Sequence, residues 1–266
     1  MIKKVFLVGI CAWGVYVIWH LSVSSNISFS SGNDQPVKLI RGPHTVLNFP
    51  SQRAKTSAII IFGSGDGGWD TLEEAIAQAC QKQGYEVIGI DSNNYADTDY
   101  NLEILQSDIY SIAQTARARF GDHPPPLIVG GYSMGAAQSI AMAGGPHPPP
   151  GLVGVLVVDM LSRGRYGLRT EDQMNVLPTG PGTFGVADFA PALKSLRVVQ
   201  WHAEEDDIDS REWLKNLDAP HREFDFPGTG HGYEDNRKAF IRQLVASIHW
   251  ILVPDEPTSK KLSGKP

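Results

Sequence analysis

Short hydrophobic runs alternate with amphipathic segments along most of the chain. The runs SAIIIFG, YEVIGID, LIVGG and GLVGVLVVDM are nearly continuously apolar, which is typical of strands buried on both faces of a sheet. Between such runs, segments such as NLEILQSDIYSIAQTARARFG repeat their apolar residues with helical spacing. This order predicts right-handed crossovers in a mostly parallel sheet with helices on both faces. The fold class is therefore α/β.

Capping signals and short motifs place the other elements. Asp70 and Glu73 form a capping box at the start of a helix predicted over 71–82. A helix of small residues begins at Met134, and an amphipathic helix over 235–251 closes the pattern. Further strands are predicted at VKLIRG, HTVLNF, RVVQWHA and HREFDF, and short helices at VADFAPALKSL and SREWLKNL.

The N-terminal segment is a targeting or anchoring signal. Lys3 and Lys4 precede an apolar run over 5–19, and a serine-rich stretch follows. The run lies between the roughly 7–15 apolar residues of a signal peptide and the roughly 20 of a spanning helix. We predict that 1–24 is either a cleaved signal peptide or an uncleaved anchor, with a linker over 25–36. Both alternatives export the rest of the chain.

Length and composition favour one large enzyme-sized domain. With 266 residues and 42% hydrophobic residues, we expect a single domain over 37–255 and a disordered tail over 256–266. The net charge of −6 provides no basic face for nucleic acid. HExxH, paired CxxC and a phosphate loop ending in GKS or GKT are all missing from the sequence, so we expect no cofactor and no metal. Cys80 is expected in the core, and Cys11 lies in the apolar segment.

The motif GYSMG carries the chemistry. Ser133 lies between Gly131 and Gly135, directly after a buried strand and before a helix, which is the setting of a nucleophile elbow. Glycines suit this turn because its backbone is strained and the strand and helix approach closely. A chain with 27 glycines also matches GxSxG by chance, so partner residues must decide.

A histidine and a carboxylate follow in the order that this fold requires. An acyl-transfer triad needs a base for the serine and an acid that orients the base, in the order Ser133, acid, histidine. His231 follows the strand HREFDF, and Asp206 follows RVVQWHA, with Asp207 beside it. Spacing favours Asp206 over Asp207. Asp159, which ends its own strand, is a further alternative acid.

An oxyanion hole would complete the site. One backbone N–H donor is expected from Met134, and the other from Ser64 or Gly65 in the loop FGSGDGGW. Asp66, in the same loop, is either a turn residue or a carboxylate that faces the cleft and receives a substrate ammonium group.

The motifs GSGDGGW, GYSMGA and GTGHGYED together resemble the VirJ/AcvB family of bacterial virulence proteins, over roughly 58–252. The resemblance implies an α/β-hydrolase fold, a periplasmic location and hydrolysis of aminoacylated phospholipid, notably lysyl-phosphatidylglycerol, at a membrane surface. It also implies that Ser133 is the nucleophile, His231 the base, and Asp206 or Asp207 the acid.

One segment departs from the family pattern. LSRGRYGLRTEDQMNVLPTGPGTFG lies where hydrolases place substrate-covering loops, and its Arg163, Arg165 and Arg169 either meet a lipid phosphate or belong to a solvated loop. We assign Asp66 and Asp207 to substrate binding. Two classes of function remain open: a serine hydrolase of a lipid or small ester, and a catalytically idle hydrolase fold that binds partners in the periplasm and assists secretion.

Overall fold

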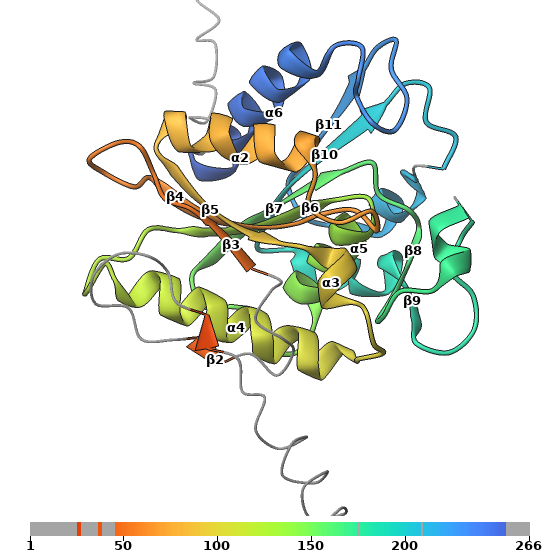
Figure 1. Ribbon diagram of the computed structural model, residues 1–266, viewed down its shortest axis with the longest axis horizontal. Helices are drawn as coiled ribbons and strands as arrows, with labels where there is room; N and C mark the ends of the chain where they lie inside the picture. The colour runs from red at the N-terminus through yellow and green to blue at the C-terminus, as the bar shows by residue number, and fades with distance from the viewer. Residues whose placement is uncertain (1–25, 28–36, 39–45, 175, 209, 254–266) are drawn as a thin grey trace, which may run out of the picture.

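A computed structural model of the chain describes residues 26–27, 37–38, 46–174, 176–208 and 210–253 (Figure 1). The predicted N-terminal signal or anchor, most of the linker and the predicted tail over 256–266 lie outside the described residues. Every helix within the described ranges is too short or too polar to cross a membrane. β1 (Asn26–Ile27), in the predicted linker, pairs antiparallel with β2 (Val37–Lys38), at the start of the predicted domain.

The centre of the molecule is a seven-stranded sheet in the order β11-β10-β7-β6-β4-β5-β3. All neighbours pair in parallel except β3, which lies at one edge and runs antiparallel to β5. The strands are β3 (Val46–Phe49), β4 (Ala58–Gly63), β5 (Tyr85–Ile90), β6 (Leu127–Tyr132), β7 (Leu152–Val158), β10 (Arg197–Ala203) and β11 (His221–Phe226).

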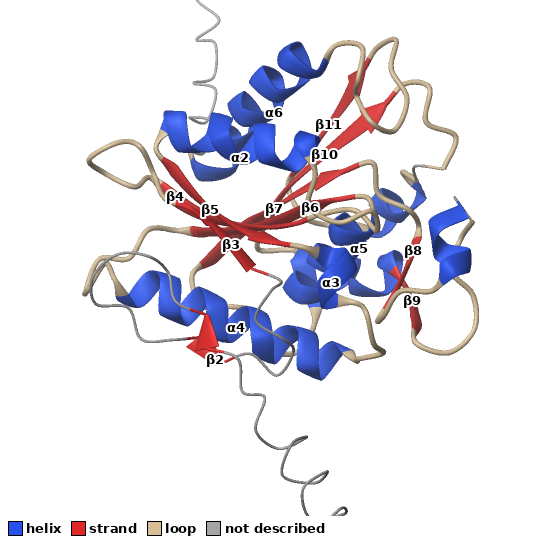
Figure 2. Cartoon of the chain, in the orientation of Figure 1, coloured by secondary structure: helices blue, strands red, loops and turns tan. Residues whose placement is uncertain are grey.

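Helices cover both faces of the sheet (Figure 2). On one face lie α2 (Thr71–Gln83) and α6 (Arg237–Leu252), and on the other α4 (Leu102–Ala118), α5 (Met134–Gly144) and the 3-10 helix η3 (Val186–Leu193). Shorter helical segments in the connections are α3 (Ser92–Tyr95), η2 (Thr170–Met174) and η4 (Glu212–Asn216). The α/β class predicted from the alternating pattern is confirmed.

Each face of the sheet has its own hydrophobic core, as the continuous apolar runs require. In β4, Ile59 and Ile61 pack in the core under α4 and α5, whereas Ile60 and Phe62 pack in the core under α2 and α6. The strand is buried at every position. The parallel sheet is therefore covered on both sides, and its exposed edge is the carboxyl edge where the loops meet.

Short sequence motifs predicted some helices more accurately than others. The predicted capping box is confirmed, because Asp70 caps the first turn of α2 and Glu73 Oε2 accepts the Asp70 backbone N–H at 3.3 Å. The helices predicted at VADFAPALKSL and SREWLKNL are 3-10 helices instead. Pro191 lies inside the first and has no N–H to donate, which disfavours a regular α-helix there.

Cys80 lies on the buried face of α2 and is 1% exposed. Burial raises the pKa of its thiol to about 12, because the thiolate is poorly solvated there. The thiol is therefore a protonated, unreactive part of the core, as its place in the sequence predicted.

Candidate active site

Ser133 occupies the sharp turn between β6 and α5. Its backbone has φ 52° and ψ −115°, a left-handed conformation that costs a non-glycine residue about 1–3 kcal/mol. The turn is fixed on both sides, because the Ser133 N–H donates to the Val158 carbonyl oxygen at 2.9 Å and the Ser133 carbonyl oxygen accepts the Ala136 N–H at 3.1 Å. Ser133 lines a cavity at the carboxyl edge of the sheet.

The glycines around Ser133 are required by close backbone contacts. A Cβ atom on Gly131 would lie 2.3 Å from the Gly135 carbonyl carbon, and one on Gly135 would lie 2.4 Å from the Gly63 carbonyl oxygen. The Gly135 N–H also donates to the Ser64 carbonyl oxygen at 3.0 Å. The start of α5 therefore rests directly on the end of β4, and GxSxG has the structural setting of a nucleophile elbow.

His231 and Asp206 are joined by a short hydrogen bond. His231 Nδ1 lies 2.6 Å from Asp206 Oδ2, although the two residues follow different strands. The other carboxylate oxygen of Asp206 accepts the Ile208 N–H at 3.0 Å, and the Asp206 N–H donates to the Ala203 carbonyl oxygen at 3.1 Å. Asp207 is an exposed residue of the same turn. Of the two neighbouring acids, the structure brings Asp206 to the imidazole.

Asp159, the third acid considered from the sequence, lies at the same place but slightly farther away. Its Oδ2 atom is 3.8 Å from His231 Nδ1, and its Oδ1 atom accepts the Ala203 N–H and the Tyr233 O–H, both at 2.8 Å. Asp206 is the acid within hydrogen-bond distance of His231, and Asp159 lies beside that pair.

The loop that carries His231 is held against the elbow. The Tyr132 O–H donates to the His231 carbonyl oxygen at 2.8 Å, and the two rings lie 4.8 Å apart. Burial by itself lowers the pKa of His231, but the hydrogen bond and charge of Asp206, with the charges of Asp159 and Asp66, outweigh burial and raise the pKa. His231 is thus a base whose protonated form is stabilised by carboxylates.

One atom each of Asp159, Asp206 and His231 lies within 4.8 Å of the others, a spacing that a metal ion could use. Two of these groups are already engaged with each other in the 2.6 Å hydrogen bond. The expectation of a metal-free site stays a prediction.

Of the expected oxyanion donors, Ser64 needs a correction. The Ser64 N–H donates to the Ile90 carbonyl oxygen at 2.9 Å, because the backbone ladder between β4 and β5 extends to this residue. The Gly65 N–H donates to Glu73 Oε1 at 3.3 Å. The Ser64 N–H is thus used in the ladder, whereas Gly65, whose Cβ position would lie 3.6 Å from Ser133 Cβ, stays a prediction as an oxyanion donor. Met134, by contrast, lines the same cavity as Ser133, as does Asp66.

Asp66 lies at the tip of a tight turn. The Gly68 N–H donates to the Gly65 carbonyl oxygen at 3.1 Å, and Asn93 Nδ2 donates to the Asp66 carbonyl oxygen at 2.6 Å. These bonds fix the Asp66 peptide beside Ser133. Asp66 also borders a second cavity, which His231 lines. It is therefore the residue that the two cavities share.

The cavity over Ser133 is small. Residues 161–174 and 176–185, which we call the covering segment, form most of its walls, with apolar contacts from Leu161, Val176 and Pro178. Its volume is about 30 Å³, room for only a few water molecules. The covering segment contains the antiparallel pair β8 (Arg163–Arg165) and β9 (Thr183–Gly185). Access to Ser133 therefore depends on this segment.

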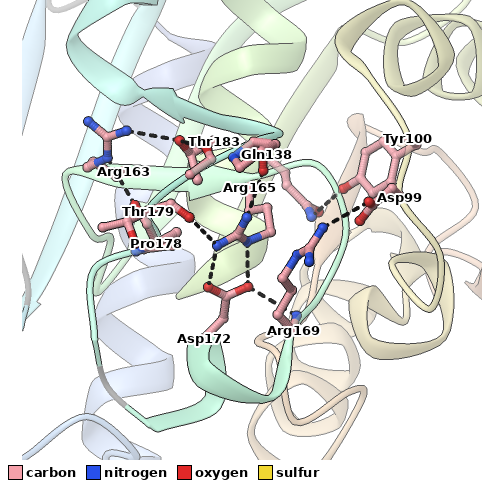
Figure 3. Close-up of polar contacts among 12 residues, drawn as sticks. Asp99, Tyr100, Gln138, Arg163, Arg165, Arg169, Asp172, Pro178, Thr179 and Thr183 are labelled. Carbon is pink, nitrogen blue, oxygen red and sulfur yellow. Dashed lines mark hydrogen bonds and ion pairs between the residues drawn. The ribbon is translucent and has the colours of Figure 1, made fainter.

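Arg165 holds the covering segment together (Figure 3). Its guanidinium donates to both carboxylate oxygens of Asp172, at 2.7 and 3.3 Å, and to the carbonyl oxygens of Thr179 and Pro181. The side chains of Arg165 and Asp172 are only 6% and 9% exposed. A bidentate pair with such low exposure fixes geometry strongly, so Arg165 is a structural residue of the segment.

The other two arginines of the covering segment are also bonded within the protein. Arg163 donates to the Pro178 carbonyl oxygen and to Thr183, and Arg169 pairs with Asp99 at 3.0 Å (Figure 3). Arg163 and Arg165 also line the cavity over Ser133, so a contact with a lipid phosphate stays a prediction. What the structure shows is that their donors hold the loop.

The sheet order and the elbow define an α/β-hydrolase fold. Solved structures with this fold include a thermostable carboxyl esterase from Bacillus coagulans in complex with glycerol (14% identity, 86% of this chain and 99% of that chain, TM-score 0.60). An α/β serine hydrolase homologue from Coxiella burnetii is similar as well (13% identity, 83% of this chain and 99% of that chain, TM-score 0.58). A Xanthomonas campestris α/β serine hydrolase described as having no lid is also similar (15% identity, 87% of this chain and 99% of that chain, TM-score 0.57).

At these identities the likeness establishes the fold alone. The family model of the bacterial virulence protein VirJ matches residues 57–250, and the chain belongs to this family. No curated protein matches the sequence significantly.

Gly131→Ala should destabilise the domain strongly, because the new methyl group would meet backbone atoms that cannot move independently. We expect a loss of about 3 kcal/mol or more in the free energy of unfolding, measured by urea denaturation. Gly67→Ala is the matched control, since a Cβ there meets nothing within 4 Å. Equal unfolding midpoints for the two variants would contradict the close-contact explanation.

Proposed function

We propose that the protein is a serine ester hydrolase in which Ser133 is the nucleophile, His231 the general base and Asp206 the acid. The observation that carries the proposal is the 2.6 Å hydrogen bond between His231 and Asp206, on a loop that contacts Tyr132, the residue directly before Ser133 in the strained elbow. The hydrolase fold is compatible with many activities and does not by itself indicate ester hydrolysis. The support for ester hydrolysis comes from the geometry of the site.

The proposed reaction uses each of these groups once in each half. Asp206 holds the proton on His231 Nδ1, which leaves Nε2 to take the proton of Ser133 as its oxygen attacks the ester carbonyl. His231 then donates that proton to the leaving alcohol, and the acyl group stays on Ser133. In the second half, His231 activates water, which releases the acid.

The negative charge on the carbonyl oxygen needs backbone donors. We assign these to the N–H groups of Met134 and Asp66, because both residues line the cavity with Ser133, whereas the Ser64 N–H is used in the sheet ladder and the Gly65 N–H contacts Glu73. Each such donor contributes about 3 kcal/mol to transition-state stabilisation.

For the substrate we propose an aminoacyl ester, with an aminoacyl-phospholipid such as lysyl-phosphatidylglycerol as the class that family membership suggests. The Asp66 carboxylate supports this choice. It borders both cavities and adds to the field that raises the pKa of His231, so it lies close to the reacting atoms. A carboxylate there opposes the developing oxyanion unless a cation lies between them, and an aminoacyl group brings such a cation.

The remaining parts of the proposal concern place and contacts. An aminoacyl-lipid substrate requires action at a membrane surface, and we propose a periplasmic location, with the N-terminal segment as signal or anchor. Asp207, which is exposed on the turn after β10, stays a prediction as a substrate contact.

A catalytically idle binding protein is the second candidate function. The small volume of the cavity over Ser133, about 30 Å³, is the observation that favours it. Labelling by a fluorophosphonate distinguishes the two candidates, because only an activated and reachable serine reacts.

The full-length protein should react with a fluorophosphonate probe at Ser133, and Ser133→Ala should abolish both labelling and ester hydrolysis. We expect a loss of at least about a thousandfold in kcat on a small activated ester, with the unfolding midpoint unchanged. Wild-type protein that stays unlabelled, or an alanine variant within threefold of wild-type activity, would exclude the serine-hydrolase mechanism.

Asp206→Asn should lower kcat by about ten-thousandfold, because asparagine favours the wrong imidazole tautomer. Asp207→Asn should lose at least a hundredfold less, since its side chain is exposed on the same turn. Steady-state kinetics of both variants on one ester settles the choice. Comparable losses in the two variants would contradict the assignment of Asp206.

Asp66→Asn should weaken hydrolysis of cationic aminoacyl esters by about ten- to a hundredfold, about 1.4–2.7 kcal/mol. Neutral esters of equal size should be hydrolysed as well as before or better, because the N–H donor is kept and a repulsive charge is removed. The ratio of kcat/KM for the two ester types is the measurement. An equal loss on both would indicate that Asp66 acts only as a turn residue.

A further inference from the structure

Two carboxylates, and not one, face the same nitrogen of His231. Asp206 Oδ2 is 2.6 Å from Nδ1, and Asp159 Oδ2 is 3.8 Å from the same atom. The two acids come from different parts of the chain, since Asp206 follows β10 and Asp159 directly follows β7. An ordinary triad needs only one of them, so the second acid requires a reason of its own.

Asp159 is built into the protein interior. The residue is 0% exposed, and its Oδ1 atom accepts hydrogen bonds from the Ala203 N–H and the Tyr233 O–H. Two donors on one oxygen stabilise a negative charge and fix the carboxylate plane. Burying a charged group is otherwise costly, which argues against Asp159 as a mere filler of the core.

Backbone strain is concentrated around this acid. Among the described residues, the non-glycine residues with positive φ are Ser133, Asp159 and Tyr233, at 52°, 44° and 53°. Tyr233 donates to Asp159, and the Ser133 N–H bonds to Val158, the residue before Asp159. Strained backbone persists where the surroundings fix it and gathers at functional sites. Here it marks Asp159 as part of the same unit as the elbow and His231.

We propose that Asp159 is a second, positioning carboxylate of the site, which stabilises the imidazolium form of His231 through its charge while Asp206 holds the Nδ1 proton. This inference rests on the proposed hydrolase function. In both halves of the reaction His231 becomes positively charged for a moment. A fixed negative charge 3.8 Å from its ring lowers the energy of that state without moving.

The other groups around His231 define what Asp159 adds. Asp66 lies on the loop after β4, and Glu73 and Glu234 line the same cavity as His231, with Arg237 as the nearby cation. Tyr132 contacts the ring from β6. Asp66, unlike Asp159, borders the cavities and is partly exposed. Asp159 is the fully buried charge next to Asp206, so its effect is screened least by water.

Asp159→Asn tests the proposal. Asparagine fits the positive φ and can accept both hydrogen bonds on Oδ1, so the fold should survive. The charges of Asp206, Asp159 and Asp66 raise the pKa of His231, and wild-type activity is therefore lost as pH falls through that raised value. Removing the Asp159 charge lowers this pKa, so the acidic limb of kcat/KM should move to lower pH by about 1 unit. The plateau of kcat should fall about tenfold.

A purely structural role predicts a different result. If Asp159 only packs the core, Asp159→Asn lowers the plateau or the unfolding midpoint and leaves the acidic limb where it is, and that outcome overturns the proposal. Tyr233→Phe is the matched control, because it disturbs the same buried contact but keeps the charge. In Tyr233→Phe the acidic limb of kcat/KM should not move to lower pH. Glu205→Gln removes an exposed acid from the Asp206 turn and should leave the limb in place.

An NMR titration of His231 in the full-length protein gives a readout that needs no activity. His231→Gln assigns its imidazole signal among the 8 histidines. The His231 pKa should be about 1 unit lower in Asp159→Asn than in wild type. If wild type fails to label with a fluorophosphonate yet the titration shifts, the hydrolase proposal fails and the Asp159 charge effect stands. If wild type is active and the titration does not shift, the Asp159 inference fails alone.

Discussion

The direct contact between the start of α5 and the end of β4 is the constraint on which the site depends. Without side chains at Gly63, Gly131 and Gly135, the two backbones approach closely enough for the Gly135 N–H to bond to the Ser64 carbonyl oxygen. That bond ties the serine turn to the glycine-rich loop. Ser133 and the glycine-rich loop are therefore held together as one unit.

Much of this unit could be predicted from the sequence, because its determinants are local. Continuous apolar runs predict the buried strands, and glycines two residues before and after Ser133 predict the elbow. The positions of Asp206 and His231 follow from chain order, since parallel strands bring their carboxyl ends to one edge. The same reasoning placed the capping box at Asp70, which needs only two side chains three residues apart.

The remaining features depend on partners far away in the chain, which spacing does not reveal. The Ser64 N–H is unavailable because the β4–β5 ladder extends one residue further than the loop composition suggests. From its charge alone, Arg165 could either meet a substrate phosphate or belong to a solvated loop. Its bidentate contact with Asp172 shows that it holds the covering segment together. The antiparallel direction of β3 has no local signature either. Asp159 looked like a weaker rival of Asp206 because sequence order cannot show two acids on one nitrogen.

The thiol of Cys80 reports on whether α2 stays packed on the sheet. A thiol with a pKa of about 12 and almost no exposure is silent toward alkylating reagents while the fold is intact. Reaction at this sulfur then requires α2 to leave the sheet, so its labelling rate measures the opening of that layer. The rate can be followed independently of any chemistry at Ser133, which lies in the loops at the carboxyl edge. A single native atom thus separates loss of structure from loss of catalysis.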